Sequence, residues 1–184
     1  MSSKDIDLLA TVRRCLAQPN VFEIQWGDRA FYDWLVAIGL TPAKSLTLGP
    51  IAIPDEVFRD FLRGCIDGDG SIVTYVDRFN TSKNAKYVYD RLFVSLVSAS
   101  PVFLQWIRAT VRRLRGVSGH LTVRHLPKHH DVWCLRYAKR ESASLLAWIY
   151  HHAEVLALRR KRERAKHAMA QATWYRHLLP DQID

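Results

Sequence analysis

The spacing of apolar residues changes along the chain, and the changes predict the order of the elements. Residues 55–66 have apolar side chains at helical spacing behind Pro54, with acidic residues in the first turn that suit the helix dipole. Residues 71–78 and 87–98 are rich in β-branched and aromatic residues, and the polar stretch 80–86 between them is typical of a hairpin loop. This part of the chain predicts a helix followed by two antiparallel strands.

The same pattern recurs further along. Residues 102–114 are amphipathic at helical spacing, residues 121–125 and 132–137 alternate as a second pair of strands, and residues 142–158 return to helical spacing. The expected order from residue 55 onward is α-β-β-α-β-β-α, which is an α+β fold with antiparallel strands.

The first part of the chain predicts shorter elements. Helical spacing is expected over 4–17 and 31–38, a strand over 21–26, and an extended connector over 41–54, which holds three prolines and one glycine. The pentapeptide of residues 10–14, Ala-Thr-Val-Arg-Arg, recurs at residues 109–113. We therefore expect three parts: a partial repeat with its linker over 1–49, the main unit over 50–166, and a C-terminal tail over 167–184.

Composition limits the class of protein. The 184 residues suit one domain with a modest extension, and 48% hydrophobic with 24% charged residues exclude a disordered chain and a coiled coil. No apolar run reaches membrane-span length, and the first residues lack the apolar segment of a signal peptide. These features favour a cytoplasmic, nucleoid-associated or organellar protein without a membrane partner. Three cysteines without a Cys-x-x-Cys pair argue against disulfides and structural zinc.

Charge is distributed unevenly and points to a partner. Residues 1–100 carry a net charge of −1 and residues 101–184 carry +10, which gives the chain +9. Such a basic half indicates a polyanionic partner, most simply a nucleic acid, with a basic solvated surface as the alternative.

The segment with the clearest chemistry is residues 61–72, a helix end that carries two carboxylates. Gly64 and Gly68 lie four residues apart on one helix face, so two copies of this helix can pack with their backbones in contact. Asp67 and Asp69 follow at the bottom of such a pair, where carboxylate oxygens are suitable ligands for Mg²⁺. Hydrolysis of a phosphodiester bond uses such a site.

The Asp-Gly-Asp-Gly stretch of residues 67–70 has two other interpretations. A calcium-binding EF-hand would put Asp69 and Gly70 at loop positions 5 and 6, but Cys65 and Val76 would then occupy the ligand positions 1 and 12. An ordinary helix end with structural aspartates remains open, although carboxylates at a helix C-terminus oppose the dipole.

Residues 62–70, Leu-Arg-Gly-Cys-Ile-Asp-Gly-Asp-Gly, resemble the LAGLIDADG motif of homing endonucleases, and the linker before and the helix after also resemble those of intein-type and archaeal-type members. The resemblance covers about residues 1–165. It implies an αββαββα unit with a saddle-shaped antiparallel sheet on the DNA major groove. It further implies two units that meet at their motif helices and cut both DNA strands with Mg²⁺ or Mn²⁺.

The resemblance also implies roles for individual residues. Asp69 corresponds to the metal-binding acid, with the carbonyl of Gly68 as a further ligand, and Asp67 caps and braces the interface. The basic residue near the scissile phosphate would come from the closing helix or the last strand, as Lys161, Arg159 or Lys139. The interface between units would hold Leu62, Gly64, Cys65 and Gly68. The chain departs from the pattern at Arg63, at Cys65 and at Ser98, where some relatives have a water-positioning glutamine.

Strand alternation predicts the residues that face DNA. If Ile72, Thr74 and Val76 face the helices, the alternate side chains face DNA, with Arg91 placed to read guanine. The expected base-facing set is Ser71, Val73, Tyr75, Asp77, Tyr89, Arg91, Phe93 and Ser95. The expected phosphate contacts are Arg78, Lys83, Lys86, Arg124 and Lys128.

The sequence thus favours a site-specific, metal-dependent DNA endonuclease that acts as a homodimer or as half of an enzyme. A non-cutting binder of the same fold, such as an RNA-splicing maturase with intron RNA as partner or a regulator, is the alternative. A fragment of a two-motif enzyme or of an intein is a third. The pairs at residues 129–130 and 151–152 are expected as surface histidines, and the basic run 159–166 as a phosphate contact.

Overall fold

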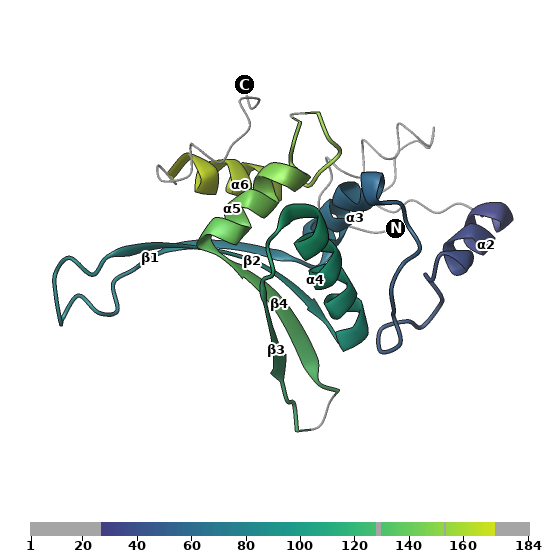
Figure 1. Ribbon diagram of the computed structural model, residues 1–184, viewed down its shortest axis with the longest axis horizontal. Coiled ribbons are helices and arrows are strands. Elements are labelled where there is room, and N and C mark those ends of the chain that lie inside the picture. Colours follow the sequence, from purple (N-terminus) through teal and green to yellow (C-terminus); the bar gives the residue numbers. More distant parts are fainter. Residues whose placement is uncertain (1–26, 128–129, 153, 172–184) are drawn as a thin grey trace.

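The computed structural model describes residues 27–127, 130–152 and 154–171 (Figure 1). From α3 to α5 the elements follow the predicted order α-β-β-α-β-β-α. The elements are α2 (Arg29–Ala37), α3 (Asp55–Gly68), β1 (Ser71–Asp77), β2 (Tyr89–Ser98), α4 (Pro101–Arg115), β3 (His120–Arg124), β4 (Val132–Ala138), α5 (Lys139–Ile149) and α6 (Arg159–Gln171).

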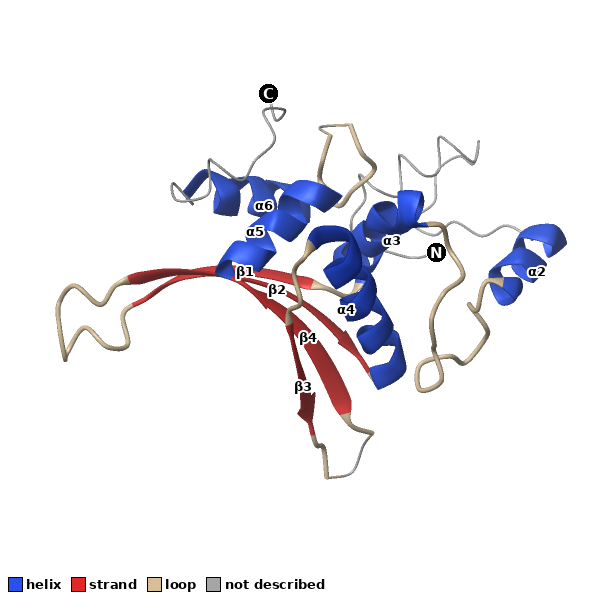
Figure 2. Cartoon of the chain, in the orientation of Figure 1, coloured by secondary structure: helices blue, strands red, loops and turns tan. Residues whose placement is uncertain are grey.

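The strands form one antiparallel sheet in the order β1-β2-β4-β3, so β2 and β4 are central. The helices gather on one side of the strands, and hairpin β1–β2 extends beyond them (Figure 2). The other face of the sheet has no helix against it in the described part of the chain. This confirms the predicted α+β fold with an antiparallel sheet.

The core lies between the sheet and the helices. On α3, Phe58, Leu62 and Ile66 repeat every four residues and are each 1% exposed. They meet fully buried residues of α4, β4 and α5, among them Leu104, Ile107, Leu135, Leu145 and Leu146. The face of α3 turned to this core is therefore fixed by its apolar spacing.

The prediction of the last helix is wrong over the second half of that helix. Helical spacing predicts a helix over 142–158, but α5 ends at Ile149 and a connector leads to α6. The guanidinium of Arg63 donates hydrogen bonds to the carbonyls of Ile149 and Leu156, both at 3.0 Å. These long-range bonds replace helical ones, so the chain leaves the helix although its apolar spacing continues.

Several predictions fall on residues outside the described ranges. They include the helix over 4–17, the strand over 21–26 and the first copy of the repeated pentapeptide, so the partial repeat over 1–49 stays a prediction. Much of the tail over 167–184 also lies outside. None of the described helices is long and apolar enough to cross a membrane.

Candidate metal centre and nucleic-acid interface

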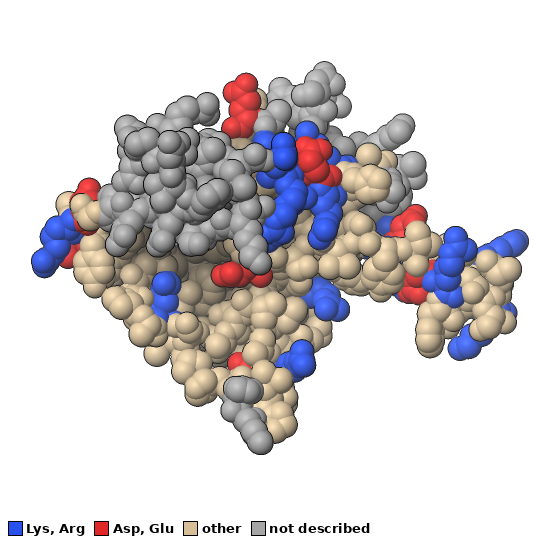
Figure 3. All heavy atoms as spheres, turned by 180° about the vertical axis from the view of Figure 1, so that it is seen from behind, with Lys and Arg blue, Asp and Glu red and all other residues tan. Residues whose placement is uncertain are grey.

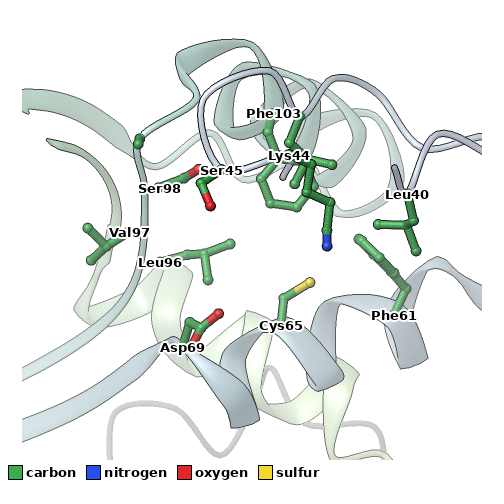
Figure 4. Close-up of a pocket in the computed structure, with 12 residues that line it drawn as sticks. Leu40, Lys44, Ser45, Phe61, Cys65, Asp69, Leu96, Val97, Ser98 and Phe103 are labelled. Atoms are coloured by element: carbon green, nitrogen blue, oxygen red, sulfur yellow. The ribbon is translucent and has the colours of Figure 1, made fainter. Parts of the chain in front are cut away.

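Asp69 lies exposed directly after the last turn of α3. Its backbone N–H donates to the carbonyl of Cys65 at 3.0 Å, which keeps it in register with the helix end. Its carboxylate borders a pocket of about 440 Å³ and points into it (Figure 4). The pocket is lined by Leu40, Lys44, Ser45, Leu48, Phe61, Cys65, Asp69, Leu96, Val97, Ser98, Ala99 and Phe103.

The connector before α3 brings polar groups to the pocket that holds Asp69. Lys44 extends from it toward Cys65, and the hydroxyl of Ser45 points into the same space (Figure 4). Burial raises the pKa of the Cys65 thiol to about 12, and the charge of Asp69 adds to the effect. The sequence identified Lys44 and Ser45 only as linker residues, since nothing in it indicates that the connector folds back over the motif helix.

Asp67 points the opposite way and is 5% exposed. Tyr150 donates its hydroxyl to Asp67 Oδ1 at 2.6 Å, and the backbone N–H of Leu158 donates to Oδ2 at 2.9 Å. Burial raises the pKa of the Asp67 carboxyl, against hydrogen bonds and nearby cations that lower it. The two aspartates therefore do not form one ligand pair, and Asp67 braces the connector between α5 and α6 within its own chain.

Lys161, which is predicted near the scissile phosphate, is buried against the end of α3. It is 5% exposed, and its Nζ donates to the carbonyls of Ile66 and Asp67 at 2.6 Å and of Gly70 at 2.8 Å. A cation is favourable near the carbonyls at the C-terminal end of a helix, where the helix dipole is negative. One of the three predicted basic residues thus caps the carboxyl end of α3. The sequence contains a sign of this burial, because Lys161 lies at helical spacing from Leu158, Ala165 and Ala168, which are all buried.

Arg63, where the chain departs from the family motif, is a second buried cation on α3. It is 8% exposed and forms an ion pair with Asp60 at 2.6 Å, in addition to its bonds to the end of α5 and the connector. The other predicted basic groups lie elsewhere on the same elements. Arg159 is exposed at the first residue of α6, and Lys139 is half-buried at the first residue of α5.

The residues predicted for an interface between units divide between two faces of α3. Leu62 is buried in the core, so it is not available to a second chain. Gly64 and Gly68 lie on the outer face, where an added Cβ would have no neighbour within 4 Å in the described part of the chain. Cys65 is half-buried beside them, and Val57 on the same face is 47% exposed. Among the described residues, nothing covers this band of small and apolar surface along α3.

The base-facing set shares one face of the sheet. Cross-strand pairs join Ser71 to Ser95, Val73 to Phe93, Tyr75 to Arg91 and Asp77 to Tyr89, while alternate residues of β2 are buried under the helices. Val76, expected to face the helices, is instead 50% exposed, since hairpin β1–β2 extends beyond them. The register continues the uncovered face onto residues that the sequence analysis missed, namely Val97, His120, Thr122, Cys134 and Arg136.

Arg91 already has partners on this face. Its Nε donates to Asp77 Oδ2 at 2.9 Å, and its guanidinium lies 5.3 Å from the ring centroid of Tyr89. A hydrogen bond from the backbone N–H of Phe79, followed by the bond from Arg91, lowers the pKa of the Asp77 carboxyl. Reading of guanine by Arg91 would compete with these contacts.

The predicted phosphate contacts lie at the edges of the uncovered face. Arg78, Lys83 and Lys86 are exposed in the loop of hairpin β1–β2, and Arg124 is exposed at the end of β3. Lys and Arg side chains gather at the outer end of this hairpin, on the right in Figure 3. Lys128 and His129 lie outside the described residues, whereas His130 is exposed and His151 half-buried.

With this geometry, the chain can be compared with solved structures. The group I intron-encoded homing endonuclease I-CeuI, solved in complex with DNA, superposes with a TM-score of 0.50 at 13% sequence identity, over 94% of this chain and 72% of that one. The chain has the fold of the LAGLIDADG homing endonucleases. At this identity the comparison establishes the fold alone.

Two further homing endonucleases align over less of the chain. I-TnaI has a TM-score of 0.43 at 22% identity, over 61% of this chain and 69% of its own. I-CvuI, solved with a DNA target, has a TM-score of 0.41 at 19% identity, over 63% of this chain and 66% of its own. The chain thus spans about two thirds of the length of I-CvuI. No sequence-family profile and no curated protein sequence matches the chain.

Proposed function

We propose that the protein is a site-specific, divalent-metal-dependent DNA endonuclease that hydrolyses phosphodiester bonds. The observation that carries the proposal is the exposed Asp69 carboxylate at the end of α3, in a homing-endonuclease fold and next in the chain to the strand that begins the uncovered sheet face. The asymmetric positive charge of the chain supports a polyanionic substrate.

The metal would be Mg²⁺ or Mn²⁺, held by the carboxylate of Asp69 and the carbonyl of Gly68. Both are hard oxygen donors at an exposed helix end, which suits a cation that keeps several waters and takes its remaining ligands from phosphate. Within the described ranges, no three His, Cys, Asp or Glu side chains come together as a metal cluster. The metal would act as a Lewis acid at the phosphate and lower the pKa of a bound water.

One chain supplies one exposed motif carboxylate, so cutting both strands requires a second unit. The open face at Gly64 and Gly68 supports a homodimer, because two such faces allow close approach of two α3 helices. The second Asp69 would then lie near the first at the bottom of the helix pair. Lys161, Arg63 and Asp67 would keep the helix end in place for this pairing and act as positioning residues.

The experiment that tests the proposal separates binding from cutting. In Asp69→Asn the side chain keeps its size but loses the charge that holds the cation, so cleavage of duplex DNA with Mg²⁺ is expected to be lost while duplex affinity is retained. Asp90→Asn, which alters an exposed aspartate on β2, serves as the matched control and should cut normally. Loss of affinity together with cleavage in Asp69→Asn, or unchanged cleavage, would refute the assigned role.

A further inference from the structure

The connector between α2 and α3 is anchored on both sides of Lys44. Leu40 and Leu48, each four positions from Lys44, pack against the core. The hydroxyl of Ser100, just before α4, donates to the carbonyl of Leu48 at 2.5 Å, and the backbone N–H of Leu48 donates to the carbonyl of Lys44 at 2.8 Å. The backbone of Lys44 is therefore held in place beside α3.

Lys44 is half-buried, and its side chain extends into the pocket that holds Asp69 (Figure 4). Lys44 and Asp69 are the two charged residues among those that line this pocket. In the described part of the chain, no carboxylate forms an ion pair with the ammonium of Lys44. Burial removes part of the hydration of a cation, and an anion close by offsets that cost. The pocket therefore favours an anionic group of the substrate next to Lys44.

The pocket borders the sheet face on which we propose that duplex DNA lies. Val97 of β2 lines the pocket, is 43% exposed, and continues the uncovered face of the sheet. Asp69 lies two residues before Ser71, the first residue of β1. A phosphate of a duplex on this face would therefore come close to both charged residues of the pocket.

The basic residues that the family resemblance suggests do not take this position. Lys161 is bonded to the carbonyls at the end of α3. Neither Lys139 nor Arg159 lines the pocket of Asp69. Lys44 is thus the basic residue that lines this pocket in the described part of the chain.

We infer that Lys44 contacts the scissile phosphate and stabilises the negative charge that develops on it during hydrolysis. The inference rests on the proposed function and adds to it a catalytic residue from the connector. In the reaction, the oxygen of a water molecule bonds to phosphorus, and the bond from phosphorus to the leaving sugar oxygen breaks. The water gives a proton to solvent and the sugar oxygen takes one up. Charge increases on the remaining phosphate oxygens meanwhile, and an ammonium held in place in a half-buried pocket stabilises it more than solvent does.

Single-turnover cleavage separates this role from DNA binding. Saturating protein is mixed with a randomised duplex library and Mg²⁺, the rate at which cut ends appear is measured, and affinity for the library is measured without Mg²⁺. In Lys44→Met the cleavage rate should fall at least about tenfold, because the developing charge loses a fixed cation. Affinity should fall less than about fivefold, since one phosphate contact among several is lost. An unchanged cleavage rate would overturn the inference.

Two further variants control for charge and for packing. Lys44→Arg keeps the positive charge and should cut within about threefold of the wild-type rate. Equal losses in Lys44→Arg and Lys44→Met would assign the effect to the packing of the connector and overturn the role of the charge. Arg112→Met, which removes an exposed arginine of α4 that does not line the pocket, should cut as the wild type does.

Chemical modification of lysines gives a measurement that does not depend on cleavage. Asp69→Asn removes the carboxylate that would repel a phosphate when no metal is bound, so a duplex phosphate can enter its pocket without being cut. This variant is treated with formaldehyde and borohydride, with and without the duplex library, and methylation of each lysine is followed by mass spectrometry. Lys44 should react more slowly in the complex. Equal reactivity with and without the duplex would overturn the contact.

The two measurements distinguish this inference from the proposed function. Cleavage that is lost in Asp69→Asn but unchanged in Lys44→Met would retain the nuclease and remove Lys44 from its site. Protection of Lys44 by the duplex, without cleavage by the wild type, would overturn the proposed function and the catalytic role of Lys44, while the phosphate contact would stand.

Discussion

Lys161 and Asp67 hold the last turn of α3 from two directions. The ammonium of Lys161 bonds to four backbone carbonyls at and just after the helix end, that of Gly68 included, while the carboxylate of Asp67 accepts bonds from Tyr150 and Leu158. Burial removes water from both side chains, which costs free energy. Their hydrogen bonds to backbone and hydroxyl groups offset this cost, because those groups are buried as well. The position of Asp69, two residues further on, depends on this turn.

Lys161→Met tests this role. The variant keeps the length of the side chain but leaves the carbonyls of the helix end buried without their donor, so we expect the free energy of unfolding to fall by about 2–3 kcal/mol. Chemical denaturation measures the change. Lys166→Met on the same helix, at a lysine whose side chain is 52% exposed, should change it by less than about 0.5 kcal/mol. Equal effects of the two variants would contradict the capping role.

Asp67 gives a pH dependence with a defined sign. Burial raises the pKa of its carboxyl above the ordinary 3.8, so its contribution to stability is complete below pH 3.8 and is lost as the pH rises through the raised pKa. Asp67→Asn does not titrate. The stability of the wild type relative to Asp67→Asn should therefore decrease from acidic to neutral pH, as measured by urea denaturation at each pH. A difference that grows toward neutral pH would contradict the direction of the shift.

Helix α3 packs one face against the core, and no described residue covers its outer face. Gly64 lies on that outer face, and Gly70 follows the end of the helix. Gly70 lies where an added Cβ would be 2.6 Å from Ile66 Cα, so only glycine allows the chain to pass from helix to β1. Gly64 has no such neighbour in the described part of the chain. Gly70 is therefore required by the fold of this chain, whereas no described neighbour requires glycine at residue 64.

Alanine substitutions should separate these two glycines. Gly70→Ala should lower the free energy of unfolding by about 1–3 kcal/mol, because backbone atoms must shift to admit the methyl group. Gly64→Ala should raise it by up to about 1 kcal/mol in a monomer, since alanine is the better helix former. Thermal unfolding of the dilute protein gives both values. Destabilisation by Gly64→Ala at concentrations where the chain is monomeric would show that this face is not open.

Most elements could be predicted from the sequence, because each follows the spacing of its own apolar residues. The strands begin or end within two residues of the prediction, as with β2, which starts at Tyr89 rather than residue 87. The end of α5 could not be predicted, since Arg63 ends it from 86 residues away in sequence. The motif indicated Asp69 and Asp67 but not their opposite directions, because Asp67 is turned by contacts with Tyr150 and Leu158, far along the chain. The inward position of Lys161 is indicated outside the motif, by its helical spacing from Leu158, Ala165 and Ala168.

At the scale of the whole molecule, the sheet separates two kinds of surface. One face is closed by helices whose buried polar groups fix the end of α3, and the other is open, aromatic along β1 and β2, and basic at its edges. Asp69 lies beside the start of β1, where these surfaces meet. A nucleic acid on the open face would thus pass close to the proposed metal, and a second chain on α3 would extend that face symmetrically.

The proposed nuclease is tested most directly by incubating a randomised duplex library with the purified protein and Mg²⁺ and sequencing the cut ends. We expect recurrent ends that flank a defined sequence, with a palindromic consensus if two chains act together. The same ends should be absent when Mg²⁺ is replaced by EDTA. Ends scattered without preference, recurrent ends that persist in EDTA, or no cleavage by protein that binds the library would contradict a site-specific, metal-dependent nuclease.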